Sequence, residues 1–522
     1  MKKRILWLSL PLALGQASYS YAQDATDALR YSQLQFGGSA RTLGIGGANV
    51  ALGADYGSVS ANPAGLGLYQ KSEIQITPGF SVGQGKGTLL NGTSSAGPLS
   101  QNANNFNFSG GAVFSSRRSR LGYGSDDSAW KGGAFAIGFT RIADFNGGSN
   151  YLGTVNDRNS ILQRLREYRT PLTGSNNGSI VSQAPDSYYN LDGLAYGGFL
   201  TDVDRGRRGQ DTLLTQIRRG AITQGEKITT SGSMSQFDLA YGGSYRDKLY
   251  IGLGLGIVTS NYNSRRTFAE SENDPSTTFS DLSLYDEVQT RGTGVNARLG
   301  LIYRVVDAVR IGASVQTPTW MRMTDTYSQS LTTNYTDNAG NVNETYTPST
   351  GTNQYAYTIT TPFRANGGVA VTIGKYGFLT GDVEYVGYQQ ARLDSNPNNT
   401  LGDNADFSAD NADIQRNYAK AVNLRFGGEA RLDIFRVRLG YARYGSPYNS
   451  SSVLSQNATG LAQNYYTAGL GLRTGSFFVD VAGVYTRYNT YYSPYLLNDY
   501  SEPVVQVKND RYTTTLTAGF TF

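Results

Sequence analysis

The most regular feature of the sequence is an alternation of apolar and polar positions, and it is clearest at the end of the chain. In residues 511–522, one set of alternate positions is apolar. The other set is small and polar, with Arg511 and Gly519 among threonines. A period of two predicts a β-strand, and two such faces suit lipid on one side and a watery lumen on the other. The last strand of a soluble β-sandwich is the alternative that this segment leaves open. The apolar face carries Tyr512, Thr514, Leu516, Ala518, Phe520 and Phe522.

The same alternation recurs along the chain and predicts about fourteen strands. In residues 251–257, Ile and Leu alternate with glycines, and in residues 422–427 apolar residues alternate with Asn423, Arg425 and Gly427. An even number of strands is what single-chain bacterial barrels have. The candidate strands begin near Glu73, Asn105, Gly132, Ser233, Lys248, Glu287, Ala308, Tyr355, Phe378, Ala419, Phe435, Tyr465, Phe477 and Asp510.

Short and long connections also alternate. Long polar stretches occupy residues 322–354, 391–418, 445–464 and 489–509. Short periplasmic turns and long outer loops are typical of outer-membrane barrels, and the parity places both chain ends in the periplasm. A soluble β-solenoid would show a fixed repeat, and the sequence shows none. The short turns are predicted at Arg246-Asp247, Val306-Asp307, Gly374 to Gly377, Asp433-Ile434 and Gly475-Ser476.

The N-terminus has the features of an export signal. Basic residues at positions 2–4 precede an apolar run over residues 5–14, and small residues end the segment at Ala22. These features predict a signal peptide over residues 1–22, with cleavage after Ala22 and no lipid-anchored cysteine behind it. The apolar run is too short to span a membrane as a helix.

Composition narrows the class further. The mean hydropathy is -0.38 and no later window holds about 20 consecutive apolar residues, which excludes a helical membrane bundle. The 38 tyrosines suit the interfacial girdles of a barrel. A net charge of +5 without a basic, aromatic stripe makes nucleic acid an unexpected partner.

The chain holds 0 His and 0 Cys, which removes the usual proton-transfer base, the thiol nucleophile and soft-metal ligands. We therefore expect no enzyme, no cofactor and no metal centre. The acidic loop with Asp403, Asp406, Asp410 and Asp413 leaves calcium open, but it lacks the glycine of an EF-hand, so a solvated loop is the favoured interpretation.

The segment 37–67 is rich in small residues and contains Ala40-Arg41, Asp55 and Asn62-Pro63-Ala64. It resembles the N-terminal hatch of the FadL-type transporters of long-chain fatty acids and hydrocarbons, whose hallmark is the asparagine-proline-alanine element. The resemblance also touches Thr361 to Arg364 and the strand that follows Gly377. It implies an all-β, fourteen-stranded outer-membrane barrel (residues 73–522) with a luminal hatch (residues 23–72).

The resemblance further implies passive uptake of hydrophobic small molecules, movement of the hatch and lateral release into the membrane. Small residues let a backbone fold within a narrow lumen, and Pro63 holds Asn62 extended so that its amide can bond nearby backbone. The expected hatch or gate residues are Arg41, Asp55, Asn62, Pro63 and Ala64, and the hatch candidates for ligand contact are Leu34, Phe36, Arg41 and Leu43. Packing within the plug is the alternative role for the second set.

The longest insertion, residues 143–232, is expected to hold two short amphipathic helices. One contains Ile161, Leu162 and Leu165, and the other contains Leu213, Leu214 and Ile217. Their apolar faces pack against the barrel rim, which is the favoured interpretation, or form a groove for a hydrophobic ligand. Gly132-Gly133 is a candidate for the strand irregularity at a lateral opening.

The polar strand positions carry charges of both signs, which predicts a cross-linked lumen rather than a selectivity ring of one sign. Phe520 and Phe522 are the expected assembly signal, read by the barrel assembly machinery, and a monomer surrounded by outer-membrane lipids is expected. The alternatives are a general porin and a secretion-system barrel of the type IX shuttle kind, with the tyrosines of residues 485–495 as a partner surface. The luminal charges are Arg298, Arg304, Arg364, Asp382, Glu384, Arg425, Glu429, Arg431 and Asp480.

Overall fold

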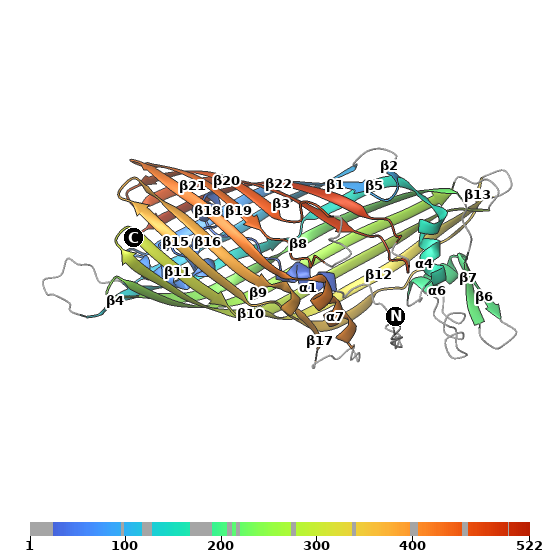
Figure 1. The fold of residues 1–522 in the computed structure, drawn as a ribbon, viewed down its shortest axis with the longest axis horizontal. Coiled ribbons are helices and arrows are strands. Elements are labelled where there is room, and N and C mark those ends of the chain that lie inside the picture. Colours follow the sequence, from blue (N-terminus) through green and yellow to red (C-terminus); the bar gives the residue numbers. More distant parts are fainter. Residues whose placement is uncertain are drawn as a thin grey trace, which may run out of the picture.

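The computed structural model describes residues 25–522 apart from 95–98, 117–127, 168–189, 206–210, 216–219, 273–277, 337–340, 397–405, 451–457 and 499–500. The expected signal peptide lies outside the described residues. The chain forms one closed antiparallel barrel (Figure 1). The last strand closes on the first, with Glu73 opposite Thr521 and Leu89 opposite Val505.

Fourteen staves build the barrel, which confirms the predicted number. Three staves are interrupted, so that β5 (Gly147–Asn156) continues β4, β12 (Trp320–Thr336) continues β11, and β14 (Asn353–Thr360) leads into β15. The staves are β1 (Glu73–Leu89), β3 (Leu99–Ser115), β4 (Trp130–Asp144), β8 (Ala221–Tyr245), β9 (Leu249–Glu272), β10 (Phe279–Val306), β11 (Val309–Gln316), β15 (Arg364–Ile373), β16 (Gly377–Gly387), β18 (Lys420–Leu432), β19 (Phe435–Tyr444), β20 (Gln463–Thr474), β21 (Phe477–Tyr492) and β22 (Val505–Thr521).

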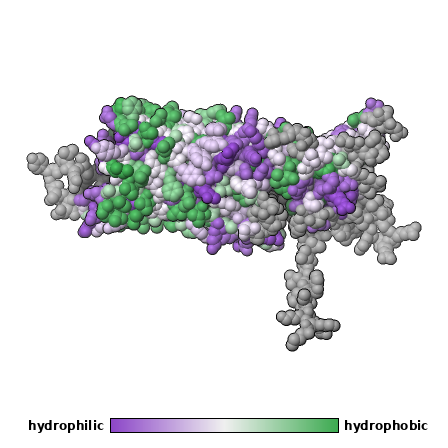
Figure 2. Space-filling model, turned by 45° about the horizontal axis from the view of Figure 1, so that its top comes forward, coloured by the Kyte–Doolittle hydropathy of each residue, from purple (hydrophilic) through white to green (hydrophobic). Residues whose placement is uncertain are grey.

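An apolar band surrounds one end of the barrel. On β9, the outward side chains of Ile251, Leu253, Leu255 and Ile257 are between 37% and 55% exposed, while the glycines between them face the lumen. Figure 2 shows the hydrophobic surface gathered towards the end that carries the C-terminus in Figure 1. Exposed apolar side chains on every second position of a closed barrel suit contact with lipid, so this end spans the outer membrane. No helix among the described residues is long and apolar enough to cross a membrane.

The strands continue far beyond the apolar band. β8, β9 and β10 contain 25, 24 and 28 residues, whereas a membrane crossing needs about 9–11. The prediction of a long loop over residues 322–354 was therefore wrong, because β12, β13 (Val342–Tyr346) and β14 occupy most of it. Their outward positions are polar, so the apolar alternation on which the strand prediction depended fades while the backbone ladder continues.

The predicted short turns are confirmed at one end of the barrel. They join β8 to β9, β10 to β11, β15 to β16, β18 to β19 and β20 to β21. Arg246 and Asp247 both have positive φ, 50° and 55°, as a tight two-residue hairpin turn requires.

The predicted insertion is shorter than expected, because residues 147–156 and 221–232 belong to the barrel strands β5 and β8. Its described residues between these strands form a small layer at the other end of the barrel (Figure 1). The expected helix with Ile161, Leu162 and Leu165 is confirmed as α4 (Ile161–Glu167), and all three residues are buried in one cluster with the barrel residues Phe268 and Leu331. The interpretation that this face packs on the rim therefore holds. The layer also contains η2 (Asp157–Asn159), α6 (Leu191–Gly197) and the β6–β7 hairpin (Thr201–Arg205 and Asp211–Thr215).

The second expected helix is not formed. Leu213 and Leu214 lie in β7, opposite Val203 and Asp202 of β6, and Ile217 lies outside the described residues. Two adjacent leucines and one more apolar residue fit either period, and the flanking Thr212 and Thr215 favour a strand.

The first described residues lie inside the barrel as short helical turns (Figure 1). These are α1 (Ala25–Ser32), α2 (Ala40–Gly44), α3 (Ser58–Ala61) and η1 (Pro63–Leu68). The remaining elements are β2 (Thr93–Ser94), η3 (Tyr388–Gln390), β17 (Arg392–Ser395) and α7 (Ser408–Asn417).

Candidate functional site

The lumen is filled by residues 25–68, which divide into two parts. We name residues 39–68 the anchor segment and residues 25–38 the upper segment. In the anchor segment, the chain turns at Asn62, which has an extended backbone (φ −153°) and ends α3, and Pro63 begins η1. The Asn62 side-chain carbonyl accepts a bond from the Ala64 N–H at 3.1 Å, which caps η1.

The Asn62 amide also joins this corner to the barrel wall. Its Nδ2 donates to the carbonyl oxygens of Val50 at 2.7 Å, Leu301 at 3.1 Å and Ala313 at 3.3 Å. Asn62 is fully buried, so these bonds satisfy an amide that has no access to water. The corner is thus fixed to β10 and β11 by the Asn62 side chain, and the Ser314 hydroxyl of β11 adds a bond to the carbonyl oxygen of Ala61 at 2.8 Å.

Glycines of the wall make this close approach possible. A Cβ atom at Gly300 would lie 1.9 Å from Asn62 Oδ1, and one at Gly252 would lie 2.2 Å from the Pro63 carbonyl carbon. Both distances are far below van der Waals contact, so no other residue fits there without displacing the corner. The alternation in residues 251–257 predicted a strand, but it did not indicate that Gly252 lies against the anchor segment.

Asp55 organises the polar side of the anchor segment. Its carboxylate accepts hydrogen bonds from the Gly57 N–H at 2.8 Å, from the Thr42 hydroxyl and from the Ser39 hydroxyl at 3.2 Å. The Arg41 guanidinium lies 3.5 Å from the same carboxylate. Asp55 therefore ties α2 to the turn before α3.

A buried ion network connects the anchor segment to the opposite wall. Arg41 lies 3.4 Å from Glu429 of β18, and Arg438 of β19 bridges Glu429 at 2.8 Å and Asp480 of β21 at 2.6 Å. Burial alone would lower the pKa of Arg41, but the carboxylates of Glu429 and Asp55 raise it above its ordinary value. Arg41 thus faces protein carboxylates, and it does not line any of the cavities described below.

Most of the remaining luminal charges are paired as well, whereas Arg304 donates to the Tyr250 hydroxyl at 3.0 Å and Asp382 accepts from the Val50 N–H at 3.0 Å. Glu384 of β16 bridges Arg364 at 3.1 Å and Arg425 at 2.6 Å, and Arg298 lies 2.7 Å from Asp238. The prediction of a lumen cross-linked by both signs is confirmed. Asp238 and Arg438, both 1% exposed, were not among the predicted luminal charges, although each occupies a polar position of an alternating strand.

The upper segment contacts the lumen through apolar surfaces and borders cavities. Leu29 and Tyr31 of α1 pack in a cluster with Met321 and Tyr357 of the barrel and Ile414 of α7. Phe36 stacks its edge on Tyr465 at 5.1 Å between ring centroids.

Several cavities border the upper segment, and two of them meet at Gln35 and Asp144. One, of about 170 Å³, is lined by Leu34, Tyr388 and Tyr448, and the other, of about 90 Å³, by Phe36 and Leu43. Gln35 and Asp144 line both. A cavity of about 150 Å³ can hold a benzene molecule, so only the first has room for a small hydrophobic ligand at rest.

Beside the smaller cavity, the barrel ladder is interrupted. β3 pairs with β4 only from Gly110 opposite Phe139 to Ser115 opposite Ala134. Beyond Phe139, the register of β4 against β8 shifts at Arg141. β5 then bends inward, so close to β1 that a Cβ atom at Gly85 would touch the carbonyl oxygen of Gly148. Among the described residues, the edge of β3 over residues 100–109 has no ladder partner on this side. We name this gap the seam.

Polar side chains cross the seam. The Asn105 amide donates to Asp144 at 3.0 Å, Arg141 donates to the carbonyl oxygen of Phe106 at 3.2 Å, and Arg511 of β22 lies 2.7 Å from Asp144. The candidate irregularity Gly132-Gly133 is real, with a register shift between Trp130 and Gly133, but it lies at the turn end of β4, away from the seam. No strand periodicity signals the seam, because β3 and β4 alternate on either side of it.

The other predicted sites are placed as follows. Asp406 accepts a bond from the Ser408 N–H at 2.9 Å before α7, and Asp403 lies outside the described residues. The described part of the chain holds no cluster of three potential metal ligands. Of the tyrosines of residues 485–495, Tyr485 faces outward, whereas Tyr491 and Tyr495 are buried. Phe520 and Phe522 stack on each other at the C-terminal end of β22.

Comparison with known proteins gives a fold and no sequence family. No protein-family model matches the sequence, and no curated protein matches it. Among solved structures, a Pseudomonas aeruginosa FadL homologue is similar with a TM-score of 0.54 and 11% identity over 93% of this chain and 99% of that chain. The P. putida toluene transporter TodX gives 0.48 and 10% over 93% and 98%. The Ralstonia pickettii toluene transporter TbuX gives 0.47 and 14% over 93% and 99%. The first likeness shows that the chain has the FadL-like fold.

Proposed function

We propose that this chain, an outer-membrane barrel of the FadL-like fold, takes up small hydrophobic molecules passively and is not an enzyme. The proposal rests on the fold together with a lumen that is filled by the chain's own N-terminal residues. A general porin needs an open watery path. Here ion pairs and apolar packing occupy the cross-section, which favours a gated route over free diffusion.

The route passes the upper segment. A ligand enters from the outer loops, occupies the cavity of about 170 Å³ beside Leu34 and Tyr388, and displaces Phe36 to reach the smaller cavity. Each cation that lines these two cavities has a carboxylate beside it, because Arg141 and Arg511 of the smaller one face Asp144 and Arg30 of the larger one pairs with Asp27. An uncharged or weakly polar ligand therefore fits better than a dianion.

The seam is the exit in this proposal. It is the place where the ladder between neighbouring staves opens, and the outward neighbours Phe106 and Phe139 on its two strands are 62% and 38% exposed to lipid. A hydrophobic molecule that leaves there gains about 25 cal/mol per Å² on entering hydrocarbon. The downhill partition of the ligand supplies the driving force, and no energy source is required.

Cross-linking the seam tests the proposal. The chain has no cysteine, so the pair Asn105→Cys with Asp144→Cys can be oxidised selectively. We expect the oxidised protein to lose uptake of a fluorescent hydrophobic probe in whole cells and to regain it after reduction. The matched control is Asn263→Cys with Gln289→Cys, whose side-chain amides lie 3.0 Å apart on the paired strands β9 and β10 and line neither cavity. This second cross-link should leave uptake unchanged.

The opposite result would overturn the proposal. Uptake that survives complete closure of the seam would exclude lateral release. Steady ionic conductance of the unmodified protein in planar bilayers would favour a general porin. A normal level of probe uptake in cells that lack the protein, with a defect in surface display of a protein cargo, would favour a secretion barrel.

A further inference from the structure

A row of tyrosines crosses four neighbouring strands on the outside of the barrel. Tyr441 of β19 lies opposite Tyr466 of β20, which lies opposite Tyr485 of β21, which lies opposite Tyr512 of β22. The successive ring centroids are 5.4, 6.1 and 4.7 Å apart. The row is thus continuous across these four strands.

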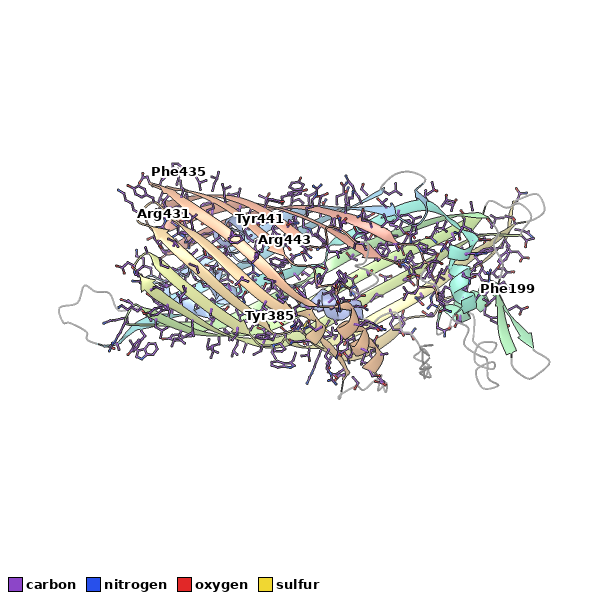
Figure 3. All side chains as sticks on the ribbon, viewed as in Figure 1. Phe199, Tyr385, Arg431, Phe435, Tyr441 and Arg443 are labelled. Atoms are coloured by element: carbon purple, nitrogen blue, oxygen red, sulfur yellow. The ribbon has the colours of Figure 1, made fainter. Side chains whose placement is uncertain are left out.

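On these strands the row marks the outer end of the apolar wall. From Tyr512 to Phe520 the outward positions of β22 are apolar or small, and this length matches a tilted crossing of about 9–11 residues. Figure 3 shows Tyr441 and Arg443 on the wall, further from the short-turn end than Phe435 of the same strand. Because aromatic rows mark the level of the headgroups, the residues just beyond the tyrosines face the outer leaflet's polar groups.

Cations stand directly beyond the tyrosines. We name Lys86, Arg443, Arg487 and Lys508 the cationic band. Lys86 and Lys508 are exposed and directly opposite each other on β1 and β22, which is unfavourable for two like charges. Among the described residues, neither lysine nor Arg443 has a carboxylate within ion-pair distance.

Among the described residues of the same rows, the only carboxylate is already occupied. Asp510 lies 3.0 Å from Arg487 and accepts a hydrogen bond from the Tyr485 hydroxyl at 2.6 Å. On the wall of β9 and β10, by contrast, the exposed Arg265 is matched by Glu287 at 2.9 Å. The cationic band therefore has an excess of positive charge that the described chain does not balance.

We propose that the cationic band binds the phosphate groups of a phosphorylated glycolipid of the outer leaflet. Lys86, Lys508 and Arg443 face the phosphates, the tyrosine row lies at the sugar level, and the apolar positions below contact the acyl chains. Charge complementarity carries the proposal, because the band lies at the height where an anionic headgroup would lie. It uses the membrane position of the barrel and does not depend on what the lumen transports.

The test is equilibrium binding of purified lipid A to the full-length protein in neutral detergent. The triple variant Lys86→Ala/Arg443→Ala/Lys508→Ala should bind roughly 100-fold more weakly, at roughly fivefold per cation, and the loss should shrink as salt increases. Arg487 is retained because it holds Asp510. Lys375→Ala, at an exposed lysine of the short-turn end, is the matched control and should bind as the unmodified protein does.

Three outcomes separate the sources of phosphate. Removal of the phosphates from lipid A should weaken its binding to the unmodified protein as much as the triple substitution weakens the binding of lipid A. Equal affinity of the unmodified protein for lipid A and for dephosphorylated lipid A would overturn the proposal. Inorganic phosphate that competes at the concentration of the lipid would show a free-phosphate site instead. The double variant Lys86→Arg/Lys508→Arg should retain binding, and heat-dependent gel mobility confirms that each variant is a folded barrel.

Discussion

The two parts of the luminal plug are held mainly by different kinds of interaction, which are hydrogen bonds and ion pairs in the anchor segment and apolar packing in the upper segment. The anchor segment is fixed by directional bonds, since Asn62 donates to three backbone carbonyls and Arg41 contacts Glu429. The upper segment is held mainly by apolar packing and by edge contacts of Tyr31 and Phe36 with rings of the wall, and it borders both cavities. It has only two hydrogen bonds to the described wall through its backbone, from Arg364 to the carbonyl oxygen of Ser32 and from the Gln35 N–H to the carbonyl oxygen of Ile142 at 2.7 Å. Gly37 and Gly38 join the two parts, and Gly38 has a φ of 117°.

This difference indicates which part moves. Breaking a buried ion pair costs several kcal/mol, whereas an aromatic contact contributes about 0.5–1.5 kcal/mol beyond the area that it buries. A small ligand supplies only a few kcal/mol of binding free energy. We therefore expect the upper segment to move about Gly37-Gly38 while the anchor segment stays in place.

The largest effect is expected at Glu429. Glu429→Gln leaves Arg41, Arg431 and Arg438 around a neutral side chain, and loss of one partner from a buried pair costs about 3–5 kcal/mol. We expect the midpoint of unfolding in urea to fall strongly in detergent micelles. Glu287→Gln, at a side chain that is 40% exposed beside Arg265, is the control and should change little. An equal, small change in both variants would show that the network does not hold the anchor segment.

A smaller effect is expected from filling the space that Gly300 leaves. Gly300→Ala places a methyl group 1.9 Å from Asn62 Oδ1, and overpacking of this kind costs about 1–3 kcal/mol. The barrel should assemble with heat-dependent gel mobility, while single-channel recordings should show openings that the unmodified protein lacks. Gly483→Ala has no heavy atom within 4 Å of the new methyl group and is the control. A closed Gly300→Ala channel would mean that the corner can shift without opening the lumen.

The barrel could be predicted from the sequence because each strand repeats the same local alternation of apolar and polar positions. Residues 251–257 and 512–522 each show the alternation that lipid on one side imposes, so each strand could be recognised by itself. The extended outer wall lacks lipid and therefore lacks that signal, which is why β12 was expected to be a loop. The helix expected at Leu213 failed because two leucines fit both periods.

The candidate site was less predictable because it depends on contacts between distant residues. Asn62 could be selected from its motif, but its bonds to Leu301 and Ala313 join positions more than 200 residues apart. Gly300 is one of many luminal glycines until Asn62 is seen against it. The seam is likewise a property of two strands, and neither Asn105 nor Asp144 is unusual in its own segment.

The upper segment gives a smaller effect with a different readout. If the contact between Phe36 and Tyr465 must break for a ligand to pass, Phe36→Ala lowers that barrier by about 1 kcal/mol, which corresponds to roughly fivefold faster uptake of the hydrophobic probe. The channel should stay closed to ions, because the anchor segment is untouched. Phe80→Ala, at an outward side chain that is 51% exposed, is the matched control. Slower uptake by Phe36→Ala would assign Phe36 to ligand binding rather than to the barrier.

The smallest effect is expected at Pro63, although it lies within the hallmark motif. Pro63 fixes its own φ at the first position of η1. Its replacement by glycine chiefly increases the conformational freedom of the anchor segment when it is detached from the wall, which weakens its attachment by about 0.4–1 kcal/mol. The Asn62 amide keeps its bonds to Val50, Leu301 and Ala313, so the corner remains fixed to the wall. Pro63→Gly should therefore leave conductance and probe uptake close to those of the unmodified protein, whereas Asn62→Ala, which removes the bonds themselves, should open the channel. If Pro63→Gly opens the channel as readily as Gly300→Ala does, the rigidity of the turn and not its hydrogen bonds holds the anchor segment, and the division between a fixed and a moving part would have to be drawn at Pro63.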